Sequence, residues 1–344
     1  MSKNLIITAD DYTAHPVIDE GTEQAIDLGL VNTVATFTNM PDSPAKIKSL
    51  WDKYKSKGLR IGVHLSVTAG AAITGNKARA ITDPDSPPGK FLFCGPGEVP
   101  LDRFFTNLNV LEDELYAQMK VLKDLGITID HISCHHGILF LYRDLFKIVT
   151  DLACDPTLMT DGRPIPLRSL MLTSKLELPG YEESSMESTG EMTALKLLSN
   201  NGLTAMKGTL TSSKKICDKI LQLRESDIHA PDLMIDTYYK RAHKYNLKRI
   251  IKKLPKVKFD PNRRHYIENH PFKKDGLFKI YELVVHLASR GIENSDPPAP
   301  NGVDSGYFKG RSKELDILRD GLLRHMDRFD VSFGYYEDCG KDVG

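Results

Sequence analysis

Short apolar segments alternate with amphipathic segments along the first half of the chain. Runs rich in apolar and β-branched residues predict strands, and segments with helical periodicity follow them. The predicted strands are Leu5–Asp10, Asn32–Asn39, Arg60–Thr68, Asp130–His135 and Ile165–Leu170. The predicted helices are Pro16–Leu30, Pro44–Lys57, Leu101–Gly126 and Tyr142–Leu152. Repeated strand–helix units of this kind predict an α/β fold with a buried parallel sheet.

The second half of the chain loses this order and then regains it. The segment from Met171 to about Phe278 is irregular, whereas a strand, a helix and a closing strand are predicted at its end: Lys279–Ala288, Ser312–Met326 and Val331–Tyr336. We therefore expect residues 1–344 to form one distorted (β/α) barrel, with an insertion or cap at about 171–278. A separate small domain at 171–278 is the alternative.

Composition places the chain among folded globular proteins. It has 344 residues, of which 40% are hydrophobic and 27% are charged. Lys and Arg together number 46, as do Asp and Glu, so global charge favours neither a nucleic acid nor a membrane as partner. Its N-terminus lacks the pattern of a secretory signal, and no apolar run is long enough to span a membrane. Five scattered cysteines without a C-x-x-C pair indicate reduced thiols, and we expect a cytoplasmic protein.

Polar side chains follow several of the predicted strands. Asp10 and Asp11 come after the first strand, His64 lies in the third, and three histidines lie near the fourth: His131, His135 and His136. The carboxyl ends of parallel barrel strands meet on one face, where active sites form. One carboxylate and two imidazoles suit a catalytic divalent ion, and a second carboxylate beside them suits a general base. Taken singly, the aspartates are equally typical of a helix cap or a turn, and each histidine is equally typical of a core.

Two further groups of residues have open interpretations. Phe91 and Phe93 lie in a Gly- and Pro-rich loop and are candidates for a lid that stacks on a sugar, with core packing as the alternative. The basic stretch Lys240–Arg264 is typical of a solvated helix face, and a patch that binds a phosphorylated sugar or an anionic polymer is the alternative.

Four sequence blocks, taken in order and spacing, resemble the YdjC-like carbohydrate deacetylase family, whose members include chitooligosaccharide deacetylases. The blocks are NLIITADDY, GLVNTVATFTNMP, IGVHLSVTAG and HISCHHG, and weaker agreement comes from IPLR, ELVVHLA and GRSKELDIL. The resemblance covers about Met1–Leu170 and Lys279–Tyr336. It implies a barrel of the glycoside hydrolase/deacetylase type and hydrolysis of the N-acetyl group of an amino sugar.

The resemblance also implies roles for individual residues. Asp11, His64 and His135 fall on metal ligands, with magnesium or zinc as the expected ion. Asp10 falls on the base, His286 on a candidate general acid, and Arg168 on an arginine that lines the pocket and binds substrate. A small carbohydrate, phosphorylated or not, is the expected partner, without nucleic acid or membrane, and a homo-oligomer is an open option.

This chain departs from the family pattern at several positions. Ser133 stands where the family commonly has Asp, at a place expected to orient His135, and Gly137 and Leu139 replace residues that are often His. Leu287 follows the later His in place of Pro, and Tyr12–Thr13 replaces a usual Phe-Gly. Two alternative functions therefore stay open: hydrolysis of another amide or ester, and a catalytically weak sugar-binding protein.

Overall fold

The computed structural model describes residues 3–82, 101–168, 223, 226–231, 233–236, 247–248, 251–252, 280–289 and 305–339. Within these residues, the strands are β1 (Lys3–Tyr12), β2 (Thr33–Thr36), β3 (Arg60–Leu65), β4 (Ile132–Cys134), β5 (Leu233–Asp236), β6 (Ile280–Val285) and β7 (Val331–Phe333). The helices are α1 (Pro16–Asp27), α2 (Ser43–Tyr54), α3 (Leu101–Thr106), α4 (Leu108–Asp124), α5 (Ile138–Leu141), α6 (Arg143–Ala153) and α10 (Ser305–Arg328).

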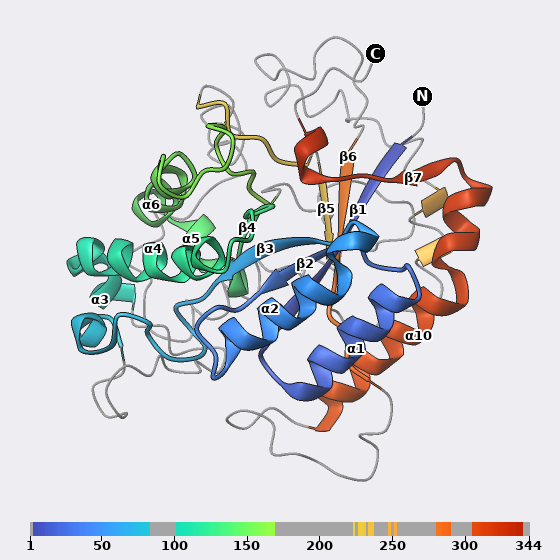
Figure 1. Cartoon of the computed structure of the whole chain (residues 1–344), viewed down its shortest axis with the longest axis horizontal. Helices are drawn as coiled ribbons and strands as arrows, with labels where there is room; N and C mark the ends of the chain where they lie inside the picture. Colours follow the sequence, from blue (N-terminus) through green and yellow to red (C-terminus); the bar gives the residue numbers. More distant parts are fainter. Residues whose placement is uncertain are drawn as a thin grey trace.

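All paired strands run parallel in one curved sheet. The strand order is β4-β3-β2-β1-β6-β5, and β7 pairs with the start of β1. The helices lie outside the sheet, with α1 and α10 side by side near β1 and with α4, α5 and α6 near β3 and β4 (Figure 1). The prediction of an α/β fold of the distorted barrel type is therefore confirmed.

The strand sequences explain why the sheet is buried on both faces. Leu5, Ile6 and Ile7 follow one another in β1, and all three are fully buried, as expected for a strand covered by helices on one side and by the barrel interior on the other. Asn32 marks the place where β2 and β7 share one edge of β1. Its side chain accepts a hydrogen bond from Ile7 N in β1 and donates one to Gly334 O just after β7. Asn32 therefore links β1 to the end of β7 at the point where β2 begins.

The structure differs from the predicted elements at three places. Asn107 divides the predicted helix Leu101–Gly126 into α3 and α4, because its backbone leaves the helical region. Within the described residues, Ile165–Leu170 contributes a single bridge between Leu167 and Ile132 instead of a strand. Finally, β5 lies inside the range predicted as an insertion, yet it pairs with β6. That range therefore contributes at least one strand to the sheet.

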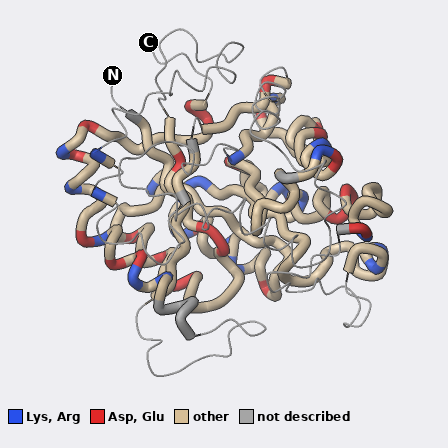
Figure 2. The backbone as a smooth tube through the Cα atoms, turned by 180° about the vertical axis from the view of Figure 1, so that it is seen from behind, with Lys and Arg blue, Asp and Glu red and all other residues tan. Residues whose placement is uncertain are grey.

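Charges of both signs are distributed over the surface. Lys and Arg positions alternate with Asp and Glu positions along the outer helices (Figure 2), and pairs such as Lys120–Asp124 form within one helix. None of the helices in the described part of the chain combines the length and apolar character needed to cross a bilayer.

Some predictions fall on residues outside the described ranges. Phe91 and Phe93 are among them, as is most of the span 171–278. Only four residues of the basic stretch are described. Leu247 and Ile251 are buried, whereas Lys248 and Lys252 are exposed, which is the pattern of an amphipathic helix with a solvated basic face.

Candidate active site

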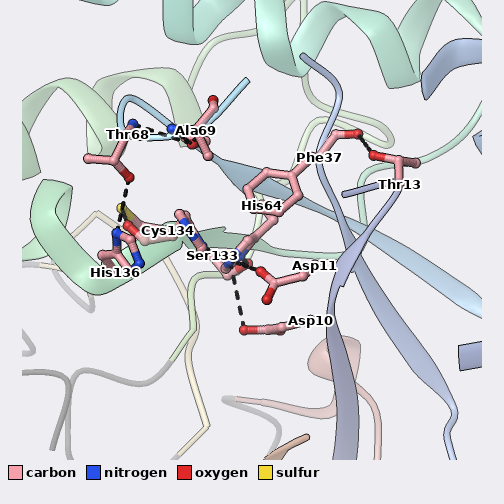
Figure 3. Close-up of polar contacts among 12 residues, drawn as sticks. Asp10, Asp11, Thr13, Phe37, His64, Thr68, Ala69, Ser133, Cys134 and His136 are labelled. Atoms are coloured by element: carbon pink, nitrogen blue, oxygen red, sulfur yellow. Dashed lines mark hydrogen bonds and ion pairs between the residues drawn. The ribbon is translucent and has the colours of Figure 1, made fainter. Parts of the chain in front are cut away.

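The carboxyl ends of β1, β3, β4 and β6 bring the predicted site residues to one edge of the sheet. Asp10 and Asp11 lie near the end of β1, His64 is the second-last residue of β3, and His135 directly follows β4. His286 directly follows β6. Figure 3 shows the two aspartates and His64 converging on one region. The sheet topology therefore gathers residues that are up to 276 positions apart, from Asp10 to His286.

A β-bulge allows two adjacent aspartates to face the same region. Ala9 pairs with Val34 and Tyr12 pairs with Thr36, so three steps along β1 match two steps along β2. The extra residue is accommodated at Asp11, whose φ of 68° is in the left-handed region. Asp tolerates this region better than most residues, at a cost of order 1–2 kcal/mol. Strain of this kind is typical of functional sites.

Asp11, His64 and His135 form a group with the composition of a metal site. Their ligand atoms all lie within 4.8 Å of one another. Oδ1 of Asp11 lies 3.4 Å from Nε2 of His64 and 3.4 Å from Nδ1 of His135. Two ligands bound about 2.0–2.1 Å from a tetrahedral ion are about 3.3–3.4 Å apart, so these spacings fit a shared ion.

The buried carboxylate of Asp11 supports the same interpretation. Its Oδ1 atom is buried and has no hydrogen-bond partner, although buried polar atoms almost always have one. Its Oδ2 atom accepts a 2.5 Å hydrogen bond from Arg311 of α10. Burial alone would raise the pKa of Asp11, but the Arg311 charge and the contacts with His135 and His64 hold this pKa well below its usual value. Asp11 therefore presents one charged oxygen to two imidazoles at 3.4 Å without a well-formed hydrogen bond to either, an arrangement that a shared cation would satisfy.

Asp10 has a different environment, because its carboxylate is fully ion-paired. Arg168 donates two hydrogen bonds of 2.6 Å to it, one to each oxygen, and donates a third of 2.9 Å to Glu282. Burial would raise the pKa of Asp10, but the charge of Arg168 outweighs it and lowers this pKa. Oδ2 of Asp10 lies 3.9 Å from Nε2 of His64. Asp10 is therefore ionised and borders the candidate metal site.

Arg168 was predicted to bind substrate, and the structure places it beside Asp10. Only 6% of this residue is exposed, and its guanidinium is held between Asp10 and Glu282. These two carboxylates raise the pKa of Arg168 well above its usual value, against the effect of burial. A permanently charged, immobilised arginine positions Asp10, whereas contact with a substrate stays a prediction.

Aromatic and hydroxyl groups fix the imidazoles of the site. The ring of Phe37 packs edge-on against His64 and His135, with centroid distances of 5.0 and 4.9 Å. Thr13 donates a 2.7 Å hydrogen bond to Phe37 O from a backbone with φ of 79°. Glycine adopts such a φ without strain, which gives a physical reason for the Gly of the family pattern at this position. Here the Thr13 hydroxyl offsets part of that strain and holds the strand that carries Phe37.

Two further histidines, His136 and His286, follow strands at the same edge of the sheet as the candidate metal ligands. Nδ1 of His136 lies 3.2 Å from Oγ1 of Thr68 (Figure 3). The ring centroid of His136 is 3.9 Å from that of His135. His286 is half-buried and directly follows β6, the strand that pairs with β1. The segment after His286 is held by α1, where a Cβ on Gly21 would lie 2.3 Å from the backbone of Ala288.

Ser133 contacts a different histidine from the one predicted. Its hydroxyl oxygen lies 2.7 Å from Nδ1 of His64, so the expectation that this position orients His135 is wrong. The parallel pairing of β3 with β4 explains the difference, because it places Ser133 directly opposite His64.

Sequence reasoning assigned no role to two buried charged residues of the site, Glu282 and Arg311. Glu282 is fully buried within the apolar segment KIYELVVHLA, and an isolated charge in such a strand signals a buried ion pair. Arg311 lies in the GRSKELDIL block, so its region was noted but its contact was not. Nothing in the local sequence indicates that Arg311 meets Asp11, which is 300 residues away.

Together, the fold and the site define a parallel-stranded α/β protein with a candidate divalent-metal site at the carboxyl edge of its sheet. The sequence profile of the family described as "YdjC-like protein" matches residues 4–326. This chain therefore belongs to the YdjC-like family, and the resemblance noted from the sequence is confirmed.

Two curated relatives share part of the sequence. A carbohydrate deacetylase of Halalkalibacterium halodurans is 31% identical over 134 residues, which cover 39% of this chain and 53% of the relative. A carbohydrate deacetylase of Listeria monocytogenes serotype 4a is 31% identical over 140 residues, which cover 39% of this chain and 51% of the relative. The chain spans about half the length of the curated relatives it matches.

A solved structure shares the fold over nearly the whole length. It comes from Enterococcus faecalis V583 and is described as a candidate cellobiose-phosphate cleavage protein. The TM-score is 0.61 at 18% identity, and the match covers 98% of this chain and 99% of that one. At this identity the likeness supports the architecture alone.

Proposed function

We propose that this protein is a metal-dependent hydrolase that removes the N-acetyl group from an amino sugar or a short chitooligosaccharide. The group formed by Asp11, His64 and His135 is the observation that carries the proposal, because three ligand atoms converge there and the buried Oδ1 of Asp11 has no hydrogen bond. The carbohydrate deacetylases among the relatives favour a sugar as the substrate.

The donor set fits a divalent ion. One carboxylate and two neutral imidazoles leave a coordination position open, as in catalytic zinc sites, and the same donors accept magnesium. When bound, such an ion supplies Lewis-acid chemistry towards water and an acetyl carbonyl. Asp11, His64 and His135 would hold it, and Arg311 would keep Oδ2 of Asp11 turned away from it.

Asp10 is the proposed general base. Its lowered pKa keeps it ionised near neutral pH, and Arg168 fixes both of its oxygens while leaving them lone pairs to accept a proton. It lies next to His64, and therefore beside the place where water would attack the acetyl carbonyl. Positioned proton transfer of this kind is typically worth ~10²–10⁴ in rate.

His286 is the proposed general acid. The amine of the sugar is a poor leaving group unless it receives a proton as the C–N bond breaks. His286 follows β6, the strand next to β1, and thus reaches the site from the side of Asp10. Arg168, Phe91 and Phe93 remain the proposed substrate-binding residues, and residues 1–344 the proposed single barrel domain.

The test is acetate release by the full chain from a panel of N-acetylated sugars. The panel contains N-acetylglucosamine, its phosphate ester and chitooligosaccharides of increasing length, each offered to chelator-stripped protein and to protein reloaded with zinc or magnesium. The proposal predicts acetate release only by the reloaded protein.

Two outcomes would replace the proposal. Protein that holds an ion but releases no acetate from any of these sugars would favour hydrolysis of another amide or ester. Protein that binds these sugars and takes up no ion would favour a sugar-binding role.

A further inference from the structure

The Ser133 hydroxyl sits behind the His64 ring, on the opposite side from the metal-ligand group. The two residues are direct partners in the parallel pairing of β3 with β4, and both are buried, with 0% and 2% exposed. The hydroxyl oxygen lies 2.7 Å from Nδ1 of His64 and 3.3 Å from the carbonyl oxygen of Val63. The contact with His64 is a short hydrogen bond, and the contact with Val63 is a long and weaker one.

One arrangement of protons satisfies both contacts. The Val63 carbonyl can only accept, and Ser133 donates its single hydroxyl proton to it. The hydroxyl oxygen then accepts from His64, whose proton lies on Nδ1 in this arrangement. A neutral imidazole with Nδ1–H has its lone pair on Nε2, and this is the atom that faces Oδ1 of Asp11.

We propose that Ser133 is a positioning residue that fixes His64 in the Nδ1–H tautomer and, because it is uncharged, sets a weaker and more readily exchanged metal site than a carboxylate would. The proposal rests on the proposed metal-dependent function. Partners of this kind orient a ligating histidine and tune its basicity, and a carboxylate partner raises basicity more than a hydroxyl does.

The balance of buried charge explains why a neutral residue suits this position. Three buried carboxylates, Asp10, Asp11 and Glu282, already meet two buried arginines, Arg168 and Arg311. In the protein without its ion, a carboxylate at position 133 would add a second uncompensated negative charge to the same interior, and burial of an unpaired charge is costly. Ser133 supplies the hydrogen bond to His64 without that charge.

The experiment measures metal affinity of the full chain by calorimetric titration with zinc and, separately, magnesium after chelator stripping. Ser133→Ala should bind the ion about 10–100-fold more weakly, and Ser133→Thr should retain the affinity because it keeps the hydroxyl. Ser133→Asp should bind more tightly than the unmodified protein. Ser43→Ala is the matched control, since Ser43 is a buried serine whose hydroxyl donates to Thr38 O instead of contacting a ligand side chain.

Nitrogen NMR of the histidine rings provides a second readout that a purely structural role would not move. In the zinc-loaded protein, His64 should bind the ion through Nε2 and carry a proton on Nδ1, and Ser133→Ala should make that proton exchange faster with solvent. A His64 that binds the ion through Nδ1 would overturn the inference, even if every variant failed to fold. So would an affinity of Ser133→Ala within twofold of the unmodified protein.

The two proposals fail in different ways. If the unmodified protein binds no divalent ion, the proposed function fails at its first step. If it binds an ion and releases acetate but Ser133→Ala and Ser133→Asp leave affinity unchanged, only the role of Ser133 is wrong.

Discussion

The two ends of β4 each carry a histidine close to an aspartate, but the two His–Asp pairs differ in their packing and hydrogen bonding. At the amino end, Asp130 accepts hydrogen bonds from Thr33 and from Nδ1 of His131, and the His131 ring stacks on Tyr336 at a centroid distance of 4.1 Å. A Cβ on Gly62 would lie only 2.3 Å from that ring, so the ring is enclosed by packing.

At the carboxyl end, His135 meets Asp11 without such enclosure. The Asp11 oxygen that faces the ring has no hydrogen-bond donor, and His64 approaches the same oxygen from the neighbouring strand. The two pairs therefore differ in their surroundings: the His131 ring is stacked and its Asp130 carboxylate is hydrogen-bonded, whereas two imidazoles converge on one oxygen of Asp11, as in a candidate metal site.

The largest expected effect separates the two ends of β4 directly. His135→Ala and His64→Ala should each lose the bound ion, and with it the hydrolase activity, because each removes a ligand atom. His131→Ala should keep the ion and instead lower the free energy of unfolding by about 2–5 kcal/mol, as removal of a large buried side chain does. Elemental analysis and urea unfolding measure these outcomes. Stoichiometric metal in both ligand variants would show that the ligand set is wrong.

The next effect concerns Asp10, which borders the site without being a proposed ligand. Asp10→Asn should retain the ion and lower kcat by ~10²–10⁴, since the amide cannot accept the proton. Asp130→Asn is the matched control at the other end of β4 and should leave kcat near that of the unmodified protein. Steady-state kinetics on the metal-reloaded variants measure kcat for both. Full turnover by Asp10→Asn would exclude Asp10 as the general base.

Arg168 tests the buried pairing that distinguishes Asp10 from Asp11. Arg168→Met should destabilise the fold by about 3–5 kcal/mol, because Asp10 and Glu282 are then buried without their cation. Arg60→Met is the control, since its exposed pair with Glu337 is worth about 0–1 kcal/mol. Urea unfolding of both variants gives the comparison. A cost for Arg168→Met no larger than that for Arg60→Met would mean that this pairing does not stabilise the fold.

The smallest effect concerns Cys134, which lies between Ser133 and His135. Burial raises the pKa of its thiol from 9.0 to about 12. The thiol therefore stays protonated at pH 8, and since the thiolate is the reactive form, alkylation should be far slower in the folded than in the unfolded protein. Any stability from this shift is present below pH 9 and is lost as the pH rises towards 12. Mass spectrometry after timed labelling measures the rates, and rapid labelling in the folded state would show that this end of β4 is open to solvent.

Most of the barrel follows from local patterns in the sequence. Continuous apolar runs such as that in β1 predict buried parallel strands, and Pro16 and Gly58 mark helix boundaries. The split of one predicted helix at Asn107 and the single bridge at Leu167 were not predicted, because both depend on contacts made elsewhere in the fold.

The site was only partly predictable. The sequence placed Asp11, His64 and His135 at strand ends, but it did not separate His131 from His135 without the family resemblance, because strand register and packing decide which ring is enclosed. The left-handed backbone of Asp11, which turns both aspartates to one side, is likewise a property of the paired strands. The partners Arg311 and Glu282 come from distant segments, and only the folded chain brings them to the carboxylates.

Anomalous diffraction from crystals grown with zinc shows directly whether Asp11, His64 and His135 share one ion, because it locates the ion itself. We predict one strong peak per chain, about 2.0–2.3 Å from Oδ1 of Asp11, Nε2 of His64 and Nδ1 of His135. Fully loaded crystals with no peak among these three atoms, or with the ion elsewhere, would contradict it.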